Sequence, residues 1–476
     1  MSVTKTVRSL DTVHLIGSLL SIGIILGVGI VPLTDTLDLR LQRLFAVLLA
    51  TLVLWITQPI PYSISSILAV VLLFALGVTD TFSAAVSGFA STLVFFVILL
   101  LLLGKSISKV NLDDWIANRL VSATSTPKSS TRRLSISLYL LALIMPSGTA
   151  RTVAFMPIID QINDLYDLDD GSRFRRFGYY MIGHVNVVGS AALMTGGGMS
   201  LVTAELINLH VRPITWFEWA MYMILPVGCI FMLTALVSSQ FYSVDDQVLV
   251  TDSTTSESSR DLEPLTGEQW LVLSTLFLAI LFWIIGSFLG VPAIIPAMFV
   301  VLVFSIPGIG ILTATDFNDI SWGVVFLIGA MLSILEVKEE LGGFDIVIDI
   351  LFSGLPVGLP VAGLVAILLG FSLLVRMIFS SVAAALLILI PVLVEFASAT
   401  PVNEFYLSLS LLLLLVSCAV LPFQVSTTLL AYEYGPLTMR EVFLFGVLTL
   451  TAAVMTVAVS WIVFWPLVDV TVDIVF

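Results

Sequence analysis

Two stretches of this chain decide the fold: residues 145–157 read MPSGTARTVAFMP, and residues 379–391 read FSSVAAALLILIP. Each interrupts a long apolar segment, and in each a serine, Ser147 or Ser381, stands ten residues before a proline. The two serines are 234 positions apart. Backbone that leaves the helix at membrane depth is tolerated only where protein buries it or where it lines a wet cavity. Matched breaks in the two halves of a membrane chain therefore point to a transporter's binding site.

Composition places the chain in a membrane. Of its 476 residues, 59% are hydrophobic and 11% are charged, and the mean hydropathy is +1.12. These values lie far outside the range of soluble domains. Apolar stretches of spanning length recur from Val13 to Pro466, and they predict an all-α membrane protein with about eleven transmembrane helices. A net charge of -14 argues against nucleic acid as a partner.

The chain divides into two halves that correspond to one another. Trp55 matches Trp283, and the breaks match at spacings of 228 to 234 residues. Each half is expected to contain a re-entrant helical hairpin and a broken helix, and an odd number of crossings per half makes the repeats inverted. The expected parts are an N-terminal helix (1–40), the first repeat (41–237), an acidic cytoplasmic linker (238–269), the second repeat (270–468) and a C-terminal tail (469–476).

Basic residues predict the orientation. With the N terminus in the cytoplasm, thirteen Lys and Arg residues fall on the cytoplasmic side and four on the outer side. This is the bias that the positive-inside rule describes. We therefore expect a multi-pass protein of the cell membrane, with the N terminus cytoplasmic and the C terminus outside.

The breaks carry chemistry for both anions and cations. A helix that starts after each break presents unpaired N–H groups, which attract anions. Carbonyls freed at the same break suit a cation. Two further breaks, TGGGMS at residues 195–200 and LPFQVSTT at residues 421–428, offer more carbonyl and hydroxyl oxygens. Such oxygens suit a hard cation such as sodium. A single break of this kind is also explained by a kink in an ordinary buried helix.

Three polar side chains lie at membrane depth. Arg151 follows the first break closely and is a candidate to hold an anion through paired hydrogen bonds. A structural pairing with an acid or with carbonyls is the alternative, and it applies equally to Arg376, which precedes the second break. His184 precedes the glycine break and is either a satisfied interior histidine or a proton-coupling group.

Short motifs resemble those of the divalent anion/sodium symporters. Residues 55–61, WITQPIP, resemble their Trp-x-Thr-Glu-x-x-Pro signature. The first tip, Ser147-Gly148-Thr149, is similar to their Ser-Asn-Thr motif, and Ser381-Val382-Ala383 occupies the second such position. Gly148 and Val382 stand where that family has asparagine. The likeness covers nearly the whole chain, from about Leu41 to Pro466.

The resemblance implies sodium-coupled uptake of dicarboxylates, tricarboxylates or sulfate by a homodimer whose transport parts move across the bilayer like elevators. It predicts a small anionic substrate and membrane lipid as partners, Na⁺ as the coupling ion and no other cofactor. We expect the substrate site to comprise the tip residues that the resemblance implies together with three residues named from the sequence itself: Ser147, Gly148, Thr149, Ser381 and Val382, with Arg151, Ser426 and Thr427. The sodium sites comprise Ser147, Gly148, Gly196 and Gly197 in the first half, and Ser381, Val382 and Val425 in the second.

Alternatives remain open. The same fold serves a proton-coupled or passive anion carrier, or a membrane receptor that does not transport. An intramembrane enzyme is not expected, because the sequence has no His-Glu-x-x-His, no Gly-x-Ser-x-Gly and no Cys/His cluster.

Overall fold

The computed structural model of the protein describes residues 12–32, 38–120, 126–242, 264–341, 359–379 and 381–475. These residues form helices joined by turns, and no strand occurs among them. The chain forms two compact units. Unit 1 contains residues 1–95 and 321–358, and unit 2 contains residues 96–320 and 359–476.

Unit 1 is a small bundle of apolar helices. Its described elements are α1 (Thr12–Ile24), the π-helical η1 (Ile25–Ile30), α2 (Leu39–Thr57), α3 (Tyr62–Ala75), α4 (Phe82–Ala85), the 3-10 helix η2 (Ser87–Ala90), the first turn of α5 (Thr92–Lys109) and α16 (Trp322–Leu341). Helix α16 comes from the second half of the sequence but packs against α3 and η2 from the first half.

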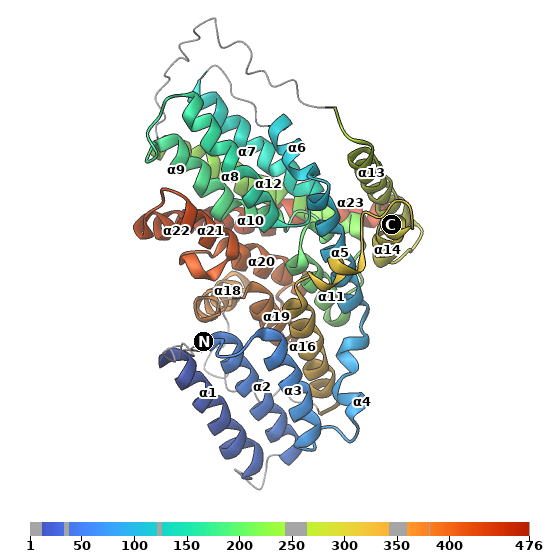
Figure 1. Cartoon of the computed structure of the whole chain (residues 1–476). Helices are drawn as coiled ribbons and strands as arrows, with labels where there is room; N and C mark the ends of the chain where they lie inside the picture. The colour runs from blue at the N-terminus through green and yellow to red at the C-terminus, as the bar shows by residue number, and fades with distance from the viewer. Residues whose placement is uncertain are drawn as a thin grey trace, which may run out of the picture. The chain divides into compact units, whose positions relative to one another are not determined.

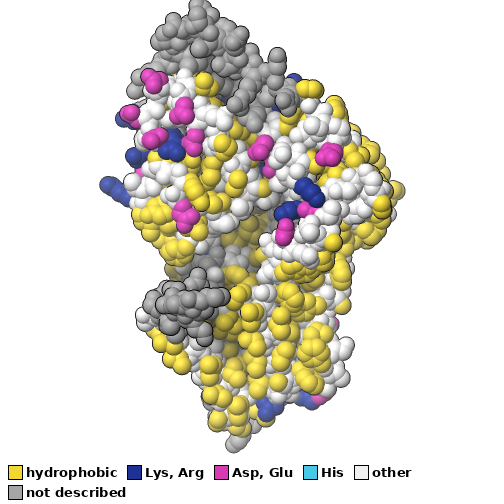
Figure 2. Space-filling view, in the orientation of Figure 1, with side chains coloured by type: hydrophobic (Ala, Val, Ile, Leu, Met, Phe, Trp, Pro, Cys, Tyr) yellow, Lys and Arg dark blue, Asp and Glu magenta, His cyan; other side chains and the backbone are white. Residues whose placement is uncertain are grey.

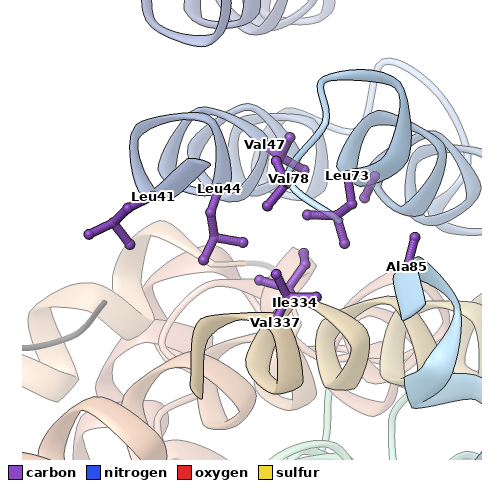
Figure 3. Close-up of a cluster of buried hydrophobic side chains, with 9 residues drawn as sticks. Leu41, Leu44, Val47, Leu73, Val78, Ala85, Ile334 and Val337 are labelled. Atoms are coloured by element: carbon purple, nitrogen blue, oxygen red, sulfur yellow. The ribbon is translucent and has the colours of Figure 1, made fainter. Parts of the chain in front are cut away.

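The core of unit 1 lies where α2, α3 and α16 meet. Leu44, Val47 and Leu73 are almost fully buried against Ile334 (Figure 3). A glycine is needed where η2 touches α16, because a Cβ on Gly88 would lie 2.2 Å from the backbone nitrogen of Ser333. This close approach fixes how η2 packs on α16.

Unit 2 holds the remaining helices (Figure 1). From the first half they are α5, α6 (Leu112–Leu120), α7 (Pro127–Ile144), α8 (Gly148–Leu165), α9 (Arg173–Tyr180), η3 (Met181–Val185), α10 (Asn186–Gly189), η4 (Met194–Gly196), α11 (Gly198–His210) and α12 (Trp216–Phe241). From the second half they are α13 (Gly267–Phe288), α14 (Ile294–Ser305), α15 (Ala314–Asn318), α18 (Val361–Ile378), α19 (Val382–Ser398), α20 (Glu404–Ser417), η6 (Pro422–Gln424), α21 (Ser426–Tyr434), α22 (Met439–Val459), η7 (Ser460–Phe464) and α23 (Trp465–Val475).

The helices match a lipid environment. Six helical stretches among the described residues are long and apolar enough to cross a membrane, and five shorter helices are also apolar. Large apolar side chains face outward, including Leu19 (61% exposed), Leu289 (71%) and Ile462 (78%). Hydrophobic side chains cover much of the visible surface (Figure 2). Water would not favour such a surface, so the expected all-α membrane fold is confirmed. The number of crossings and the inverted repeats stay predictions.

Several predicted segments are now placed. The expected breaks fall between α7 and α8 and between α18 and α19, although Ser380 and residues 342–358 lie outside the described residues. Of the expected linker (238–269), residues 243–263 lie outside them too. The segment expected as a C-terminal tail continues the last helix, because α23 extends to Val475.

Candidate functional site

The two predicted tips have the same local structure. Helix α7 ends at Ile144, and α8 begins at Gly148 after its N-cap residue, Ser147, whose Oγ accepts a hydrogen bond from the backbone N–H of Ala150 at 3.3 Å. Serine is favoured at this position because its hydroxyl satisfies an N–H that the first helical turn leaves free.

The second tip repeats this arrangement. Helix α18 ends at Ile378, and α19 begins at Val382 after Ser381, whose Oγ accepts from the N–H of Ala384 at 3.3 Å. Ser381 is half-buried and Val382 is buried. Both serines that the sequence singled out are therefore helix caps.

The two broken helices restart without a side-chain cap. Helix α11 begins at Gly198 after Gly197, and α21 begins at Ser426 after Val425; neither N-cap residue makes a side-chain hydrogen bond to its helix. The first N–H groups of such helices are available to an anion. Gly198 and Ser426 are exposed. A Cβ on Gly196 would lie 2.5 Å from the carbonyl oxygen of Ser190, so this break requires a glycine.

The first tip meets the start of α21. The hydroxyls of Thr149 and Ser426 lie 3.0 Å apart, and a Cβ on Gly148 would lie 3.7 Å from Thr427 Cγ2. The buried Thr427 hydroxyl donates to the carbonyl of Gly183 at 2.7 Å. The structure therefore brings Ser147, Gly148 and Thr149 of the first half next to Ser426 and Thr427 of the second.

Arg151 lies next to this junction, since its Nη2 would be 3.7 Å from a Cβ on Gly148. Its side chain is fully buried. Its guanidinium donates to the carbonyl of Met145, to Asn186 Oδ1 at 2.7 Å, to the Asn186 carbonyl at 3.0 Å and to Ser190 Oγ at 2.9 Å. These contacts match the structural pairing with carbonyls that the sequence left open. In this conformation each nitrogen of the guanidinium donates to the protein.

Arg376 occupies a comparable place at the second tip. It is fully buried, and its guanidinium donates to the carbonyls of Phe379, Leu415 (3.2 Å) and Gln424 (3.2 Å). Phe379 and Gln424 lie close in sequence to Ser381 and Val425. The structure thus joins Arg376 to residues that lie one or two positions before Val425 and Ser381.

Some contributors were hard to foresee. Ser190 was not singled out, because a lone serine in an apolar run gives little signal, yet it contacts Arg151 and lies beside Gly196. Asn186 contacts Arg151 too, and its side chain donates to the Gly148 carbonyl at 2.7 Å. His184 is buried with Nε2 3.1 Å from the Val442 carbonyl, while its Nδ1 has no hydrogen-bond partner among the described residues.

Comparison with known proteins places the chain in a family. The family described as "Sodium:sulfate symporter transmembrane region" matches residues 12–470. The chain therefore belongs to the sodium:sulfate symporter family, and the resemblance seen in its motifs is confirmed. This is a family of transporters.

Relatives from plants and bacteria are distant. The chain is 26% identical over 310 residues to "Dicarboxylate transporter 2, chloroplastic" of Spinacia oleracea, covering 63% of this chain and 53% of that one. It spans about half the length of the chloroplast relatives it matches. It is 22% identical to "Putative malate transporter YflS" of Bacillus subtilis, over 72% of this chain and 73% of that one.

A solved structure shares the fold. The YdaH transporter of Alcanivorax borkumensis aligns with a TM-score of 0.51 at 14% identity, covering 84% of this chain and 96% of that one. At this identity the likeness concerns the fold alone. It agrees with the all-helical membrane architecture described above.

Proposed function

We propose that this protein is a secondary transporter that moves a small divalent anion, a di- or tricarboxylate or sulfate, across the membrane. The observation that carries the proposal is the junction at Thr149 and Ser426, where a capped hairpin tip meets the uncapped start of α21. Helix N-termini that converge in this way supply N–H donors and positive dipole ends to an anion. Membership of a transporter family and the names of the relatives support the same reading.

The proposal includes the arrangement expected from the resemblance. The carrier is a homodimer in the cell membrane, and its transport parts move in the manner of an elevator. Sodium is the coupling ion that the resemblance predicts, and protons are the second candidate. The proton alternative is supported by His184, which is buried in η3, within the first broken helix, and whose Nδ1 has no hydrogen-bond partner among the described residues.

Uptake by proteoliposomes tests the proposal. We expect labelled succinate, citrate or sulfate to accumulate against its gradient when a sodium or a proton gradient is imposed. Flux that never exceeds equilibration indicates a passive carrier. No flux above empty liposomes for any of the anions would contradict the proposal and favour a receptor.

A matched pair of variants ties uptake to the junction. Thr149→Val removes the hydroxyl that faces Ser426, and we expect it to reduce uptake several-fold. Thr451→Val is the control, because Thr451 is exposed on α22 and its hydroxyl donates within its own helix, to the Val447 carbonyl. Equal uptake by the two variants would remove the junction from the site.

A further inference from the structure

The residues expected to bind sodium can be tested for their fit to a cation. At the first tip, the Ser147 hydroxyl accepts from Ala150, and the Ser147 carbonyl accepts from the Arg151 N–H at 3.1 Å. The Gly148 carbonyl accepts from Asn186 Nδ2 at 2.7 Å. Three of the oxygens expected to bind sodium at this tip therefore each accept a hydrogen bond within the protein.

The chain itself supplies a positive charge at this tip, on the side chain of Arg151. The Arg151 guanidinium is surrounded by four oxygens from Met145, Asn186 and Ser190, all of them neutral. It joins the last carbonyl of the first hairpin arm to the broken helix of the same half. Arginine stays protonated in proteins, so a positive charge is fixed between the tip and the break. A second cation close to it would be repelled.

The second half repeats this feature from a different position in the sequence. Arg376 precedes its tip, whereas Arg151 follows its own, yet both donate to the carbonyl two residues before the capping serine: Phe379 and Met145. Arg376 also joins its tip to the broken helix of the same half, through the carbonyls of Leu415 and Gln424. Two arginines that reach the same local target from opposite arms indicate a requirement for positive charge at both tips.

We propose that the guanidinium groups of Arg151 and Arg376 take the place of the two coupling cations, so that anion binding at the tips needs no sodium. This inference rests on the proposed function and replaces the sodium coupling that the resemblance predicts. Two fixed positive charges together balance the charge of a divalent anion. Both arginines act as positioning residues: they hold the tips and supply charge, while the converging helix N-termini contact the anion.

Binding measurements on the purified wild-type protein test the proposal. Succinate and sulfate are titrated by calorimetry in sodium, potassium and choline buffers of equal ionic strength. We expect the dissociation constants in the three buffers to agree within about two-fold. Binding that weakens ten-fold or more when choline replaces sodium would overturn this inference and leave the proposed function intact. No binding of any anion in any buffer would overturn both.

Charge-removing variants give a second readout. Arg151→Gln and Arg376→Gln keep a hydrogen-bonding side chain but lose the charge, and we expect succinate affinity to fall at least ten-fold. In Arg151→Gln we also expect sodium to restore part of the affinity, because the vacated oxygens can then accept a cation. A purely structural role would not make affinity depend on sodium.

Controls separate charge from folding. Arg151→Lys and Arg376→Lys keep the charge and are expected to bind better than the Gln variants. Arg440→Gln removes the same charge from an exposed position at the start of α22, and its affinity should match the wild type. Folded Gln variants that bind succinate as tightly as the wild type, in sodium and in choline alike, would overturn the proposal. If a Gln variant does not fold, the wild-type comparison of buffers still decides.

Discussion

Single side chains at the tips perform tasks that depend on only a few neighbouring atoms. Ser147 and Ser381 each cap the helix that follows them, with the same 3.3 Å hydrogen bond to the N–H three residues later. Because that bond is local, one residue type meets the same need in both halves. The burial of Arg151 and Arg376 is different, since an arginine is tolerated there only when acceptors from other segments surround it.

Removing the serine caps tests whether these two hydrogen bonds stabilise the protein. Ser147→Ala or Ser381→Ala leaves an N–H of the first turn without its partner, and we expect each to destabilise the protein by about 1 kcal/mol. Thermal unfolding in detergent measures the change. Ser305→Ala is the control, because the exposed Ser305 hydroxyl only donates to the Val301 carbonyl of its own helix. A loss as large in Ser305→Ala as in the tip variants would show that capping is not the cause.

Among the elements, the short helix α15 is joined to the end of α5 by two ion pairs. Lys109 Nζ lies 2.6 Å from Asp316 Oδ2, and the Asp316 side chain is 7% exposed. Lys105 and Asp319 form a looser pair at 3.6 Å, and Asp319 is 64% exposed. The buried pair is the one expected to stabilise the attachment, because exposed pairs contribute little.

The pH dependence of stability follows from Asp316. Burial acts to raise the pKa of its carboxyl, but hydrogen bonds from Lys109 and Thr313 outweigh burial, so the pKa lies below its ordinary value. A carboxyl with a lowered folded-state pKa stabilises the protein above its unfolded-state pKa of about 3.9. That contribution is lost as the pH falls through the folded value.

We therefore expect Asp316→Asn to lower the thermal unfolding temperature at pH 7, and the difference from the wild type to shrink below about pH 4. Asp319→Asn should change little at either pH. Unfolding of detergent-solubilised protein between pH 7 and pH 3 measures both variants. A difference between Asp316→Asn and the wild type that stays constant over this range would contradict the assignment.

At the scale of the whole molecule, spatial contacts group the chain differently from its sequence halves. Unit 1 unites the first 95 residues with residues 321–358, and unit 2 contains the tips and broken helices of both halves. The candidate site described above lies within unit 2. This grouping neither requires nor excludes the inverted repeats, which remain a prediction from spacing.

Topology reporters test the expected orientation. An odd number of crossings places the termini on opposite sides, and the distribution of basic residues puts the N terminus in the cytoplasm. A fluorescent protein that matures only in the cytoplasm should be bright when fused before residue 1 and dark when fused after Phe476. Bright fusions at both ends would mean an even number of crossings and would contradict the eleven crossings that the sequence predicts.

Features that depend on local interactions could be predicted from the sequence alone. Hydropathy predicted a helical membrane protein, and the short motifs predicted the family. Pro146, Ser147 and Gly148 marked where α8 begins and Ser381 marked where α19 begins, since turns and caps are set by neighbouring residues. The start of α11 at Gly198 followed from three successive glycines.

The contacts of the polar groups at the tips could not be predicted from the sequence, and the packed structure defines them. Asn186 is 35 residues from Arg151 in sequence, and Ser426 is 277 residues from Thr149. No local pattern specifies such pairs, because they form when separate helices pack and buried polar groups must find partners. For the same reason the sequence allowed two roles for Arg151, anion binding or structural pairing. The packing of α8 against α10 brings its guanidinium to Asn186, so that it donates to protein groups.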